Sequence, residues 1–209
     1  MPRIATLSVI LSGGVLIAAC GMADETSGDA GEPRATAEGG LECYTRGSAE
    51  EAAQRPSPLT RVAFTFTGGE GLLCYGAPAA AGRAIMDGLV PYGQPWRIGA
   101  NEPTTLHLSA PAVVGGVALE PGSYSLYAVP DAEEWRFIVN ASWERWGIPI
   151  DAAVRASDIG SFTARPEPTS EMVERLTYDW EPMEGGAMGN LVLEWENTRV
   201  PFHVHPPNG

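Results

Sequence analysis

Residues 62–75 read Val62-Ala63-Phe64-Thr65-Phe66-Thr67-Gly68-Gly69-Glu70-Gly71-Leu72-Leu73-Cys74-Tyr75 and have the pattern of a β-hairpin. Val62, Phe64 and Phe66 alternate with smaller or polar residues, which is the period of a strand with one buried face. Gly68-Gly69 then offers the positive φ angles that a tight turn needs before the second apolar run. The stretch therefore predicts two neighbouring antiparallel strands.

The same alternation recurs along the rest of the chain, between turns rich in glycine and proline. Further strands are expected at 104–109, 112–117, 123–129, 135–140, 161–165, 172–180, 190–196 and 199–205. Three stripes of alternate residues are expected in the core: Trp135, Phe137 and Val139; Leu191, Leu193 and Trp195; Val200, Phe202 and Val204. Short helical turns are expected only at 79–86 and 151–156. Many short strands separated by turns predict an all-β fold, a two-sheet antiparallel β-sandwich with at most short helical turns.

The N-terminus has the pattern of a lipoprotein signal peptide. Arg3 precedes an apolar run over residues 4–16, and small residues stand directly before Cys20. The run is shorter than the roughly 20 residues that a membrane-spanning helix needs, so a retained anchor helix is the weaker alternative. We expect residues 1–19 to be removed and Cys20 to carry lipid chains that hold the protein on a membrane. Because Gly21 rather than Asp follows, we expect the outer membrane, facing the periplasm, in a Gram-negative cell.

Residues 20–58 have the composition of a flexible acidic tether. Small and acidic residues dominate the segment, and large apolar ones are rare. Such a segment cannot bury enough surface to offset the entropy of ordering it. Residues 59–206 then form one domain, which is long enough for a real hydrophobic core.

Cys43 and Cys74 remain as a pair once Cys20 is lipidated. Outside the cytoplasm disulfides persist, so the two can form a bridge that pins the end of the tether to the domain. Such a bridge would contribute roughly 3 to 4 kcal/mol by closing a loop of the unfolded chain. Alternatively the two lie too far apart, with Cys74 buried in a strand and Cys43 free.

The chain is strongly acidic, with 13 basic residues against 26 acidic ones and a net charge of −13. An acidic surface repels nucleic acid, which we exclude as a partner. All the basic residues are arginines, so Schiff-base, phosphate-loop and kinase mechanisms that need a lysine are excluded as well. A nucleophile-elbow motif and a glycine-rich phosphate loop are also missing from the sequence. We therefore expect no cofactor, and the sequence identifies no protein partner.

Several short blocks resemble those of a bacterial family known as domain of unknown function 2911. The blocks are Arg55-Pro56-Ser57-Pro58, Tyr75-Gly76-Ala77-Pro78, Gly82-Arg83, Leu89-Val90-Pro91-Tyr92-Gly93, Trp96-Arg97-Ile98-Gly99-Ala100-Asn101-Glu102, Thr104-Thr105, the run from Leu119 to Pro130, Trp135, Asn140, Trp146-Gly147 and Trp195-Glu196-Asn197-Thr198-Arg199-Val200. They cover residues 55–205. The resemblance implies a secreted or lipid-anchored β-rich domain, and it brings no catalytic residues with it.

The segment 88–106 crowds turn-forming, aromatic and polar residues together and contains the most specific of these blocks. The candidate ligand-binding residues are Arg83, Tyr92, Trp96, Arg97, Asn101 and Glu102. An arginine fork, an amide and a carboxylate beside aromatic faces suit a polar ligand such as a sugar or a small carboxylate. In the alternative interpretation, Arg97 and Glu102 pair with each other and with loop carbonyls, and they only hold an ordered turn.

Three functions follow from these patterns. The first is a non-catalytic, lipid-anchored binder of a small polar ligand or an envelope glycan. The second is a hydrolase in which Glu102 acts as acid or base and Arg97 orients the substrate, although the sequence shows no clear second titrating group. The third is a purely structural envelope protein.

Histidines offer a weak metal-binding pattern. His203 and His205 share one face of the last expected strand, and His107 could supply a third ligand from another strand. Near the end of the chain, two such histidines are more typical of a solvated surface. We therefore expect no metal site.

Overall fold

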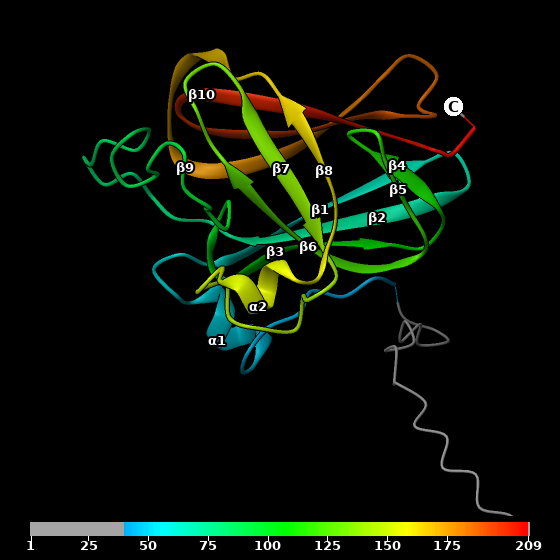
Figure 1. Cartoon of the computed structure of the whole chain (residues 1–209), viewed down its shortest axis with the longest axis horizontal. Coiled ribbons are helices and arrows are strands. Elements are labelled where there is room, and N and C mark those ends of the chain that lie inside the picture. The colour runs from blue at the N-terminus through cyan, green and yellow to red at the C-terminus, as the bar shows by residue number, and fades with distance from the viewer. Residues whose placement is uncertain (1–39, 209) are drawn as a thin grey trace, which may run out of the picture. The chain divides into compact units, whose positions relative to one another are not determined.

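The computed structural model describes residues 40–208, which form two antiparallel β-sheets and two short helices (Figure 1). The helices are α1 (Ala49–Ala53) and α2 (Ala152–Arg155). The strands are β1 (Leu59–Phe66), β2 (Gly69–Gly76), β3 (Ala100–Leu108), β4 (Ala112–Val114), β5 (Val117–Leu119), β6 (Gly122–Val129), β7 (Trp135–Asn140), β8 (Asp158–Ala164), β9 (Glu167–Pro182) and β10 (Gly189–His205). The large sheet has the order β1-β2-β3-β6-β7-β8 and the small sheet the order β5-β4-β10-β9. The predicted all-β, two-sheet fold is confirmed.

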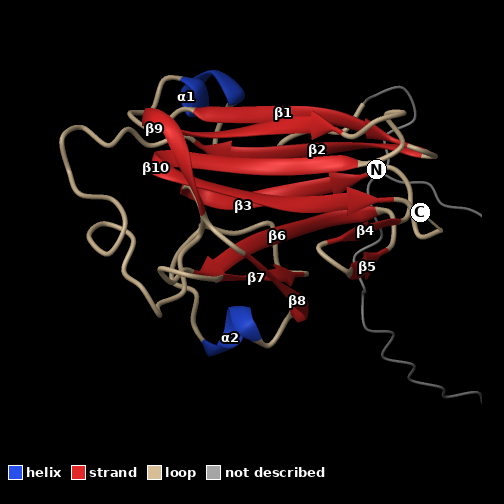
Figure 2. Ribbon diagram, turned by 90° about the horizontal axis from the view of Figure 1, so that it is seen from above, coloured by secondary structure: helices blue, strands red, loops and turns tan. Residues whose placement is uncertain are grey.

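The hairpin expected from residues 62–75 is present as β1 and β2. Its strands pair from Phe66 with Gly69 to Leu59 with Gly76. Phe64 and Phe66 are buried in the core, as their alternation predicted. This hairpin forms one edge of the large sheet, and Figure 2 shows its strands running side by side with β3 and β6.

Aromatic rings from both sheets meet in the core between them. All nine residues of the three predicted stripes are buried. Phe137 of β7 stacks on Phe162 of β8, with ring centroids 5.2 Å apart, and meets Phe202 of β10 at 5.1 Å. Each such ring removes a large apolar area from water, which stabilises the sandwich by roughly 1.5 to 3 kcal/mol per side chain.

One predicted strand is wrong. Residues 112–117 form the hairpin of β4 and β5 rather than a single strand, because Val114 pairs with Val117. Gly115 and Gly116 have φ angles of 58° and 94°, which is the geometry of a tight two-residue hairpin turn. The β-branched residues on both sides of the glycines favour a strand, so the sequence pattern did not predict this turn.

The strand β10 doubles back on itself. The Nδ1 atom of His203 lies 3.2 Å from the Oδ1 atom of Asn190, although in a straight strand 13 residues would span roughly 43 Å. The reversal coincides with register shifts around Glu196, whose φ angle is 56°. Figure 1 shows β9 curving with it. The two strands expected at 190–196 and 199–205 are thus the two arms of one bent strand.

The helices agree only in part with the sequence. The turn expected at 151–156 is α2, capped by the Asp151 side chain, whereas 79–86 contains no helix. The helix α1 lies where a tether was expected, and Ser48 and Glu51 form a capping box at its start. No helix within residues 40–208 is long and apolar enough to cross a membrane.

Residues 41–58, here called the N-terminal strap, belong to the domain. A disulfide joins Cys43 to Cys74 of β2, and the ring of Tyr44 meets that of Trp143 edge-on at 5.8 Å. Figure 1 shows α1 and α2 on the side of the large sheet opposite β9 and β10. The tether predicted over 20–58 therefore extends too far toward the domain, because its last part is the strap. The signal peptide, Cys20 and the rest of the tether lie outside the described residues.

We expect the disulfide to contribute substantially to stability. It closes a loop between residues 31 positions apart, so replacing both cysteines by alanine should lower the free energy of unfolding by roughly 3 to 4 kcal/mol. Urea denaturation followed by tryptophan fluorescence measures this loss. A reducing agent should destabilise the parent and leave the double variant unchanged; a loss below about 1 kcal/mol would contradict the expectation.

Candidate functional site

The backbone around the start of β3 is unusual. Ile98, just before β3, and Asn101, its second residue, have φ angles of 47° and 65°, and a β-branched residue such as Ile98 rarely adopts this left-handed region. Each such residue costs roughly 1 to 3 kcal/mol. The cost is offset because the Ile98 carbonyl accepts hydrogen bonds from the Thr104 and Tyr178 hydroxyls, both at 3.0 Å. Because this turn is fixed, the side chains on its two sides point to opposite faces of the large sheet.

Trp96 points into the core. Its ring stacks on Trp195 at 6.0 Å and meets Trp135 edge-on at 5.8 Å. Its backbone exchanges two hydrogen bonds with Ala128 of β6. The ring thus packs between the two sheets.

Glu102 is the centre of a closed ion-pair cluster on the outer face of the large sheet. Only 4% of the residue is exposed. Its two carboxylate oxygens accept from Nη1 of Arg55 at 2.8 and 2.7 Å, and Oε1 also accepts from the Arg46 backbone N–H at 2.8 Å. Arg55 in turn donates to the Arg46 carbonyl at 2.7 Å. We call this arrangement the Glu102 clasp.

The clasp keeps Glu102 ionised at neutral pH. Burial raises the pKa of Glu102, but the hydrogen bonds from Arg55 and from the Arg46 N–H, with the Arg55 charge, outweigh it and lower the pKa below its ordinary value. The carboxylate is therefore charged and already hydrogen-bonded on both oxygens.

Arg97 and Asn101 support the same region without pairing with Glu102. Arg97 donates to the Gly99 and Asn101 carbonyls at 3.3 and 3.0 Å. Asn101 donates its side-chain N–H to the Ser57 carbonyl of the strap at 2.8 Å. The predicted partner of Glu102 was Arg97; the structure has Arg55 instead, which stands in the first block of the resemblance.

Trp146 and Gly147 complete the surroundings of the clasp. The guanidinium groups of Arg46 and Arg55 lie 6.0 and 5.9 Å from the Trp146 ring centroid. Gly147 must be a glycine, because a Cβ there would lie 2.6 Å from both Arg97 Cδ and the Asn101 carbonyl oxygen. Three blocks of the resemblance therefore meet at one structural cluster.

Arg83 and Tyr92 lie on the 77–99 connection, which Figure 1 shows extending beyond the strand ends. Arg83 donates to the Ala79 and Ala80 carbonyls at 2.6 and 2.9 Å. Burial and the nearby acidic side chains raise the pKa of Tyr92. The contacts of the six predicted ligand-binding residues thus fall into three sets: the clasp region, the core around Trp96, and this connection.

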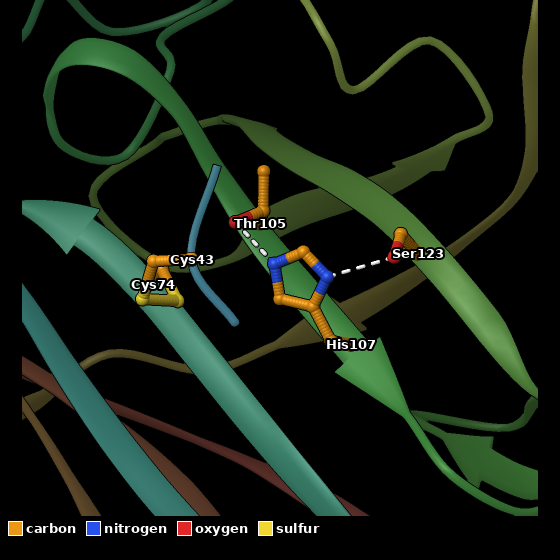
Figure 3. Close-up of a disulfide and its surroundings, with 5 residues drawn as sticks. All are labelled: Cys43, Cys74, Thr105, His107 and Ser123. Carbon is orange, nitrogen blue, oxygen red and sulfur yellow. Dashed lines mark hydrogen bonds between the residues drawn. A yellow bond between two sulfur atoms is a disulfide. The ribbon is translucent and has the colours of Figure 1, made fainter. Parts of the chain in front are cut away.

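His107 occupies a buried position on the outer face of the large sheet (Figure 3). Its ring nitrogens lie 2.8 Å from the Ser123 hydroxyl and 3.0 Å from the Thr105 hydroxyl, and its ring meets Trp143 edge-on. Burial lowers the pKa of His107 to about 4. Both nitrogens are therefore engaged by neighbours within the sheet.

His203 and His205 lie on β10 of the small sheet, apart from His107. Their rings are 5.2 Å apart. Burial and the neighbouring His205 lower the pKa of His203. Within residues 40–208, no group of three or more His, Cys, Asp or Glu residues is arranged to hold a metal ion.

A recess that the sequence did not reveal lies beside α2 on the outer face of β6, β7 and β8. It encloses about 230 Å³, and its lining includes Tyr127, Arg136, Arg155 and Asp158. None of the six predicted ligand-binding residues lines it. The only sequence signal was the strand alternation, which turns Tyr127 and Arg136 away from the core. We call this hollow the β6–β8 recess.

The Asp158 carboxylate at the β6–β8 recess is held by two buried residues. The Tyr127 hydroxyl donates to Oδ2 and the Asn140 amide donates to Oδ1, both at 2.8 Å. Burial, the hydrogen bond to Asp158 and the Asp158 charge raise the pKa of Tyr127 to about 12. The phenol therefore stays a hydrogen-bond donor.

The comparisons with known proteins agree with the blocks described above. A family model described as "Protein of unknown function (DUF2911)" matches residues 57–204. The chain belongs to this family. No curated protein and no solved structure matches it.

The DUF2911 match begins at Ser57, whereas the folded domain of this member begins earlier. The Ser57 carbonyl is the acceptor for Asn101, and the strap before it supplies Arg46 and Arg55 to Glu102. In this DUF2911 domain, the block that looked most like a ligand site therefore binds the chain's own N-terminal strap.

We expect Glu102→Gln to destabilise the protein by roughly 3 kcal/mol, because it leaves the buried part of Arg55 without its counter-charge. Chemical denaturation at pH 7 measures the loss. The matched control is Glu167→Gln, which breaks an exposed ion pair with Arg199 and should cost less than about 1 kcal/mol. Equal losses in the two variants would contradict a structural role of the clasp.

The stability difference between the parent and Glu102→Gln also depends on pH. Because folding lowers the Glu102 pKa below its ordinary value of 4.5, the stabilisation is complete above that pH and is lost as the pH falls through the folded-state pKa. The stability difference between the parent and Glu102→Gln should therefore shrink in acid. This prediction is contradicted if the stability difference stays constant down to a pH at which Glu102 is fully protonated.

Proposed function

We propose that this protein is a lipid-anchored component of the cell envelope whose domain binds a small polar ligand or a glycan without catalysing a reaction. The anchor is proposed from the sequence, in which an apolar run and small residues precede Cys20. The Cys43–Cys74 disulfide supports an oxidising compartment, because such bonds are rare in the cytosol.

The observation that carries the non-catalytic proposal is the saturation of Glu102. A general acid at neutral pH needs a raised pKa and a free path to the substrate. Glu102 has a lowered pKa, is almost fully buried, and bonds to Arg55 and Arg46 through both oxygens. This geometry opposes the hydrolase in which Glu102 acts as acid or base.

The same observation favours a second candidate, a purely structural envelope protein. The polar residues of the 96–102 block are used to hold the strap and the turn. Binding is nevertheless the better-supported function. The β6–β8 recess places polar groups in a hollow, whereas the polar groups of the Glu102 clasp are already bonded to one another.

The anchor is tested by replacing Cys20 with alanine in the full-length gene. The parent should sediment with the membrane fraction and incorporate a labelled fatty acid, whereas Cys20→Ala should do neither. Cys43→Ala is the matched control, since it removes another cysteine and should leave the lipid in place. Fatty-acid labelling of Cys20→Ala at the parent level would refute the anchor.

Binding is tested by a thermal-shift screen of the full chain against glycans, small carboxylates and divalent metal ions. A true ligand at about 100 times its Kd should stabilise the protein by roughly 2.7 kcal/mol, which raises Tm by several degrees. The screen is repeated with Arg97→Ala and Glu102→Gln. Equal stabilisation of the parent and both variants excludes the clasp region, with Arg97 and Glu102, as the binding site.

Two other results would change the proposal. If no ligand in the screen raises Tm, the structural candidate is favoured. If a stabilising ligand is recovered chemically altered, the non-catalytic proposal is wrong.

A further inference from the structure

We infer that the β6–β8 recess binds a small organic monocarboxylate, with its carboxylate between Arg136 and Arg155 and its apolar body against the sheet. This inference gives a place and a ligand class to the binding function proposed above, and it rests on that function.

The charged rim of the recess comes from two arginines on different elements. Arg136 projects from β7 and Arg155 ends α2, and both are exposed. Within the described residues neither forms a salt bridge, whereas Arg55 and Arg199 do. In a chain with twice as many acidic as basic residues, two such cations at one hollow reverse the local charge. The guanidinium fork matches a carboxylate in shape and charge.

Part of the recess lining is apolar. Ile138 of β7, which is 6% exposed, and Val129 of β6 both line the recess. Ile159 of β8 is 46% exposed, so an occupant of the recess would cover apolar surface that water now contacts. The volume of about 230 Å³ suits a small ligand.

Asp158 restricts the ligand to a single negative charge. With Arg136, Arg155 and Asp158, the lining carries a net charge of only about one positive unit. Tyr127 and Asn140 hold the Asp158 carboxylate in one orientation, so it cannot turn away from a second anionic group. Phosphate, with its higher charge and no apolar body, is therefore a poor occupant.

A neighbouring hollow lined by α2 does not compete for an anion. It shares Arg155 and Asp158 but adds Asp151 in place of Arg136. The net charge of its lining is negative, so we place the ligand carboxylate between Arg136 and Arg155.

The test is isothermal titration of the full chain with three probes. Benzoate carries both the charge and an apolar body, benzyl alcohol carries the body without the charge, and inorganic phosphate carries the charge without the body. We expect benzoate to bind at least tenfold more tightly than either of the others. Arg136→Gln and Arg155→Gln should each weaken benzoate binding about tenfold, since each removes one charge-assisted hydrogen-bonding group.

Arg61→Gln is the matched control. Arg61 is exposed on β1, at the opposite edge of the same sheet, so its loss changes the net charge equally and should leave benzoate binding unchanged. The inference is overturned if phosphate or benzyl alcohol binds as well as benzoate, or if the three variants weaken binding equally.

The outcomes also separate this inference from the proposed function. A ligand from the thermal-shift screen that binds Arg136→Gln and Arg155→Gln as tightly as the parent would refute the recess but keep the binding function. If neither benzoate nor any screened ligand binds, both fail.

Discussion

The buried ion pair between Glu102 and Arg55 is the constraint on which the outer layer of this domain depends. A carboxylate at a 4% exposed position loses most of its hydration, and only a complete set of donors compensates for that loss. Both donors come from the N-terminal strap, and the Arg55 guanidinium lies over Trp146. The ion pair therefore joins the strap, the start of β3 and the loop after β7.

The inner layer is tied to the same short segment. Tyr178 of β9 donates to the Ile98 carbonyl, and the Trp96 ring packs against Trp195 of β10, so the small sheet contacts the turn from one side. Glu102 binds the strap on the other side of the large sheet. A segment that contacts both layers needs tight turns, aromatic rings and charged groups within a few residues. That composition also resembles a ligand site, which explains why the sequence alone left both interpretations open.

Much of the fold could be predicted from local pattern, and most of the polar geometry could not. Alternation placed Phe64, Phe137 and Phe202 in the core, because the period of a strand is a property of neighbouring residues. The partner of Glu102 is 47 positions away, and the two donors that hold Asp158 belong to other elements. Composition also placed the strap in a tether, although the capping box of Ser48 and Glu51 marks a helix there. Such contacts depend on the three-dimensional arrangement rather than on local pattern.

The disulfide also determines how the domain responds to a pull on the chain before it. A force applied ahead of Cys43 passes through a covalent bond to Cys74, in a strand that has hydrogen-bonded neighbours on both sides. The strap from Tyr44 to Pro58 carries almost none of that load, since it lies in parallel with the bond. Reduction would shift the whole load to the strap and its ion pair. The oxidised domain therefore resists tension through its sheet, and the reduced domain would resist it only through the polar contacts of the strap with β3 and through one end of β1.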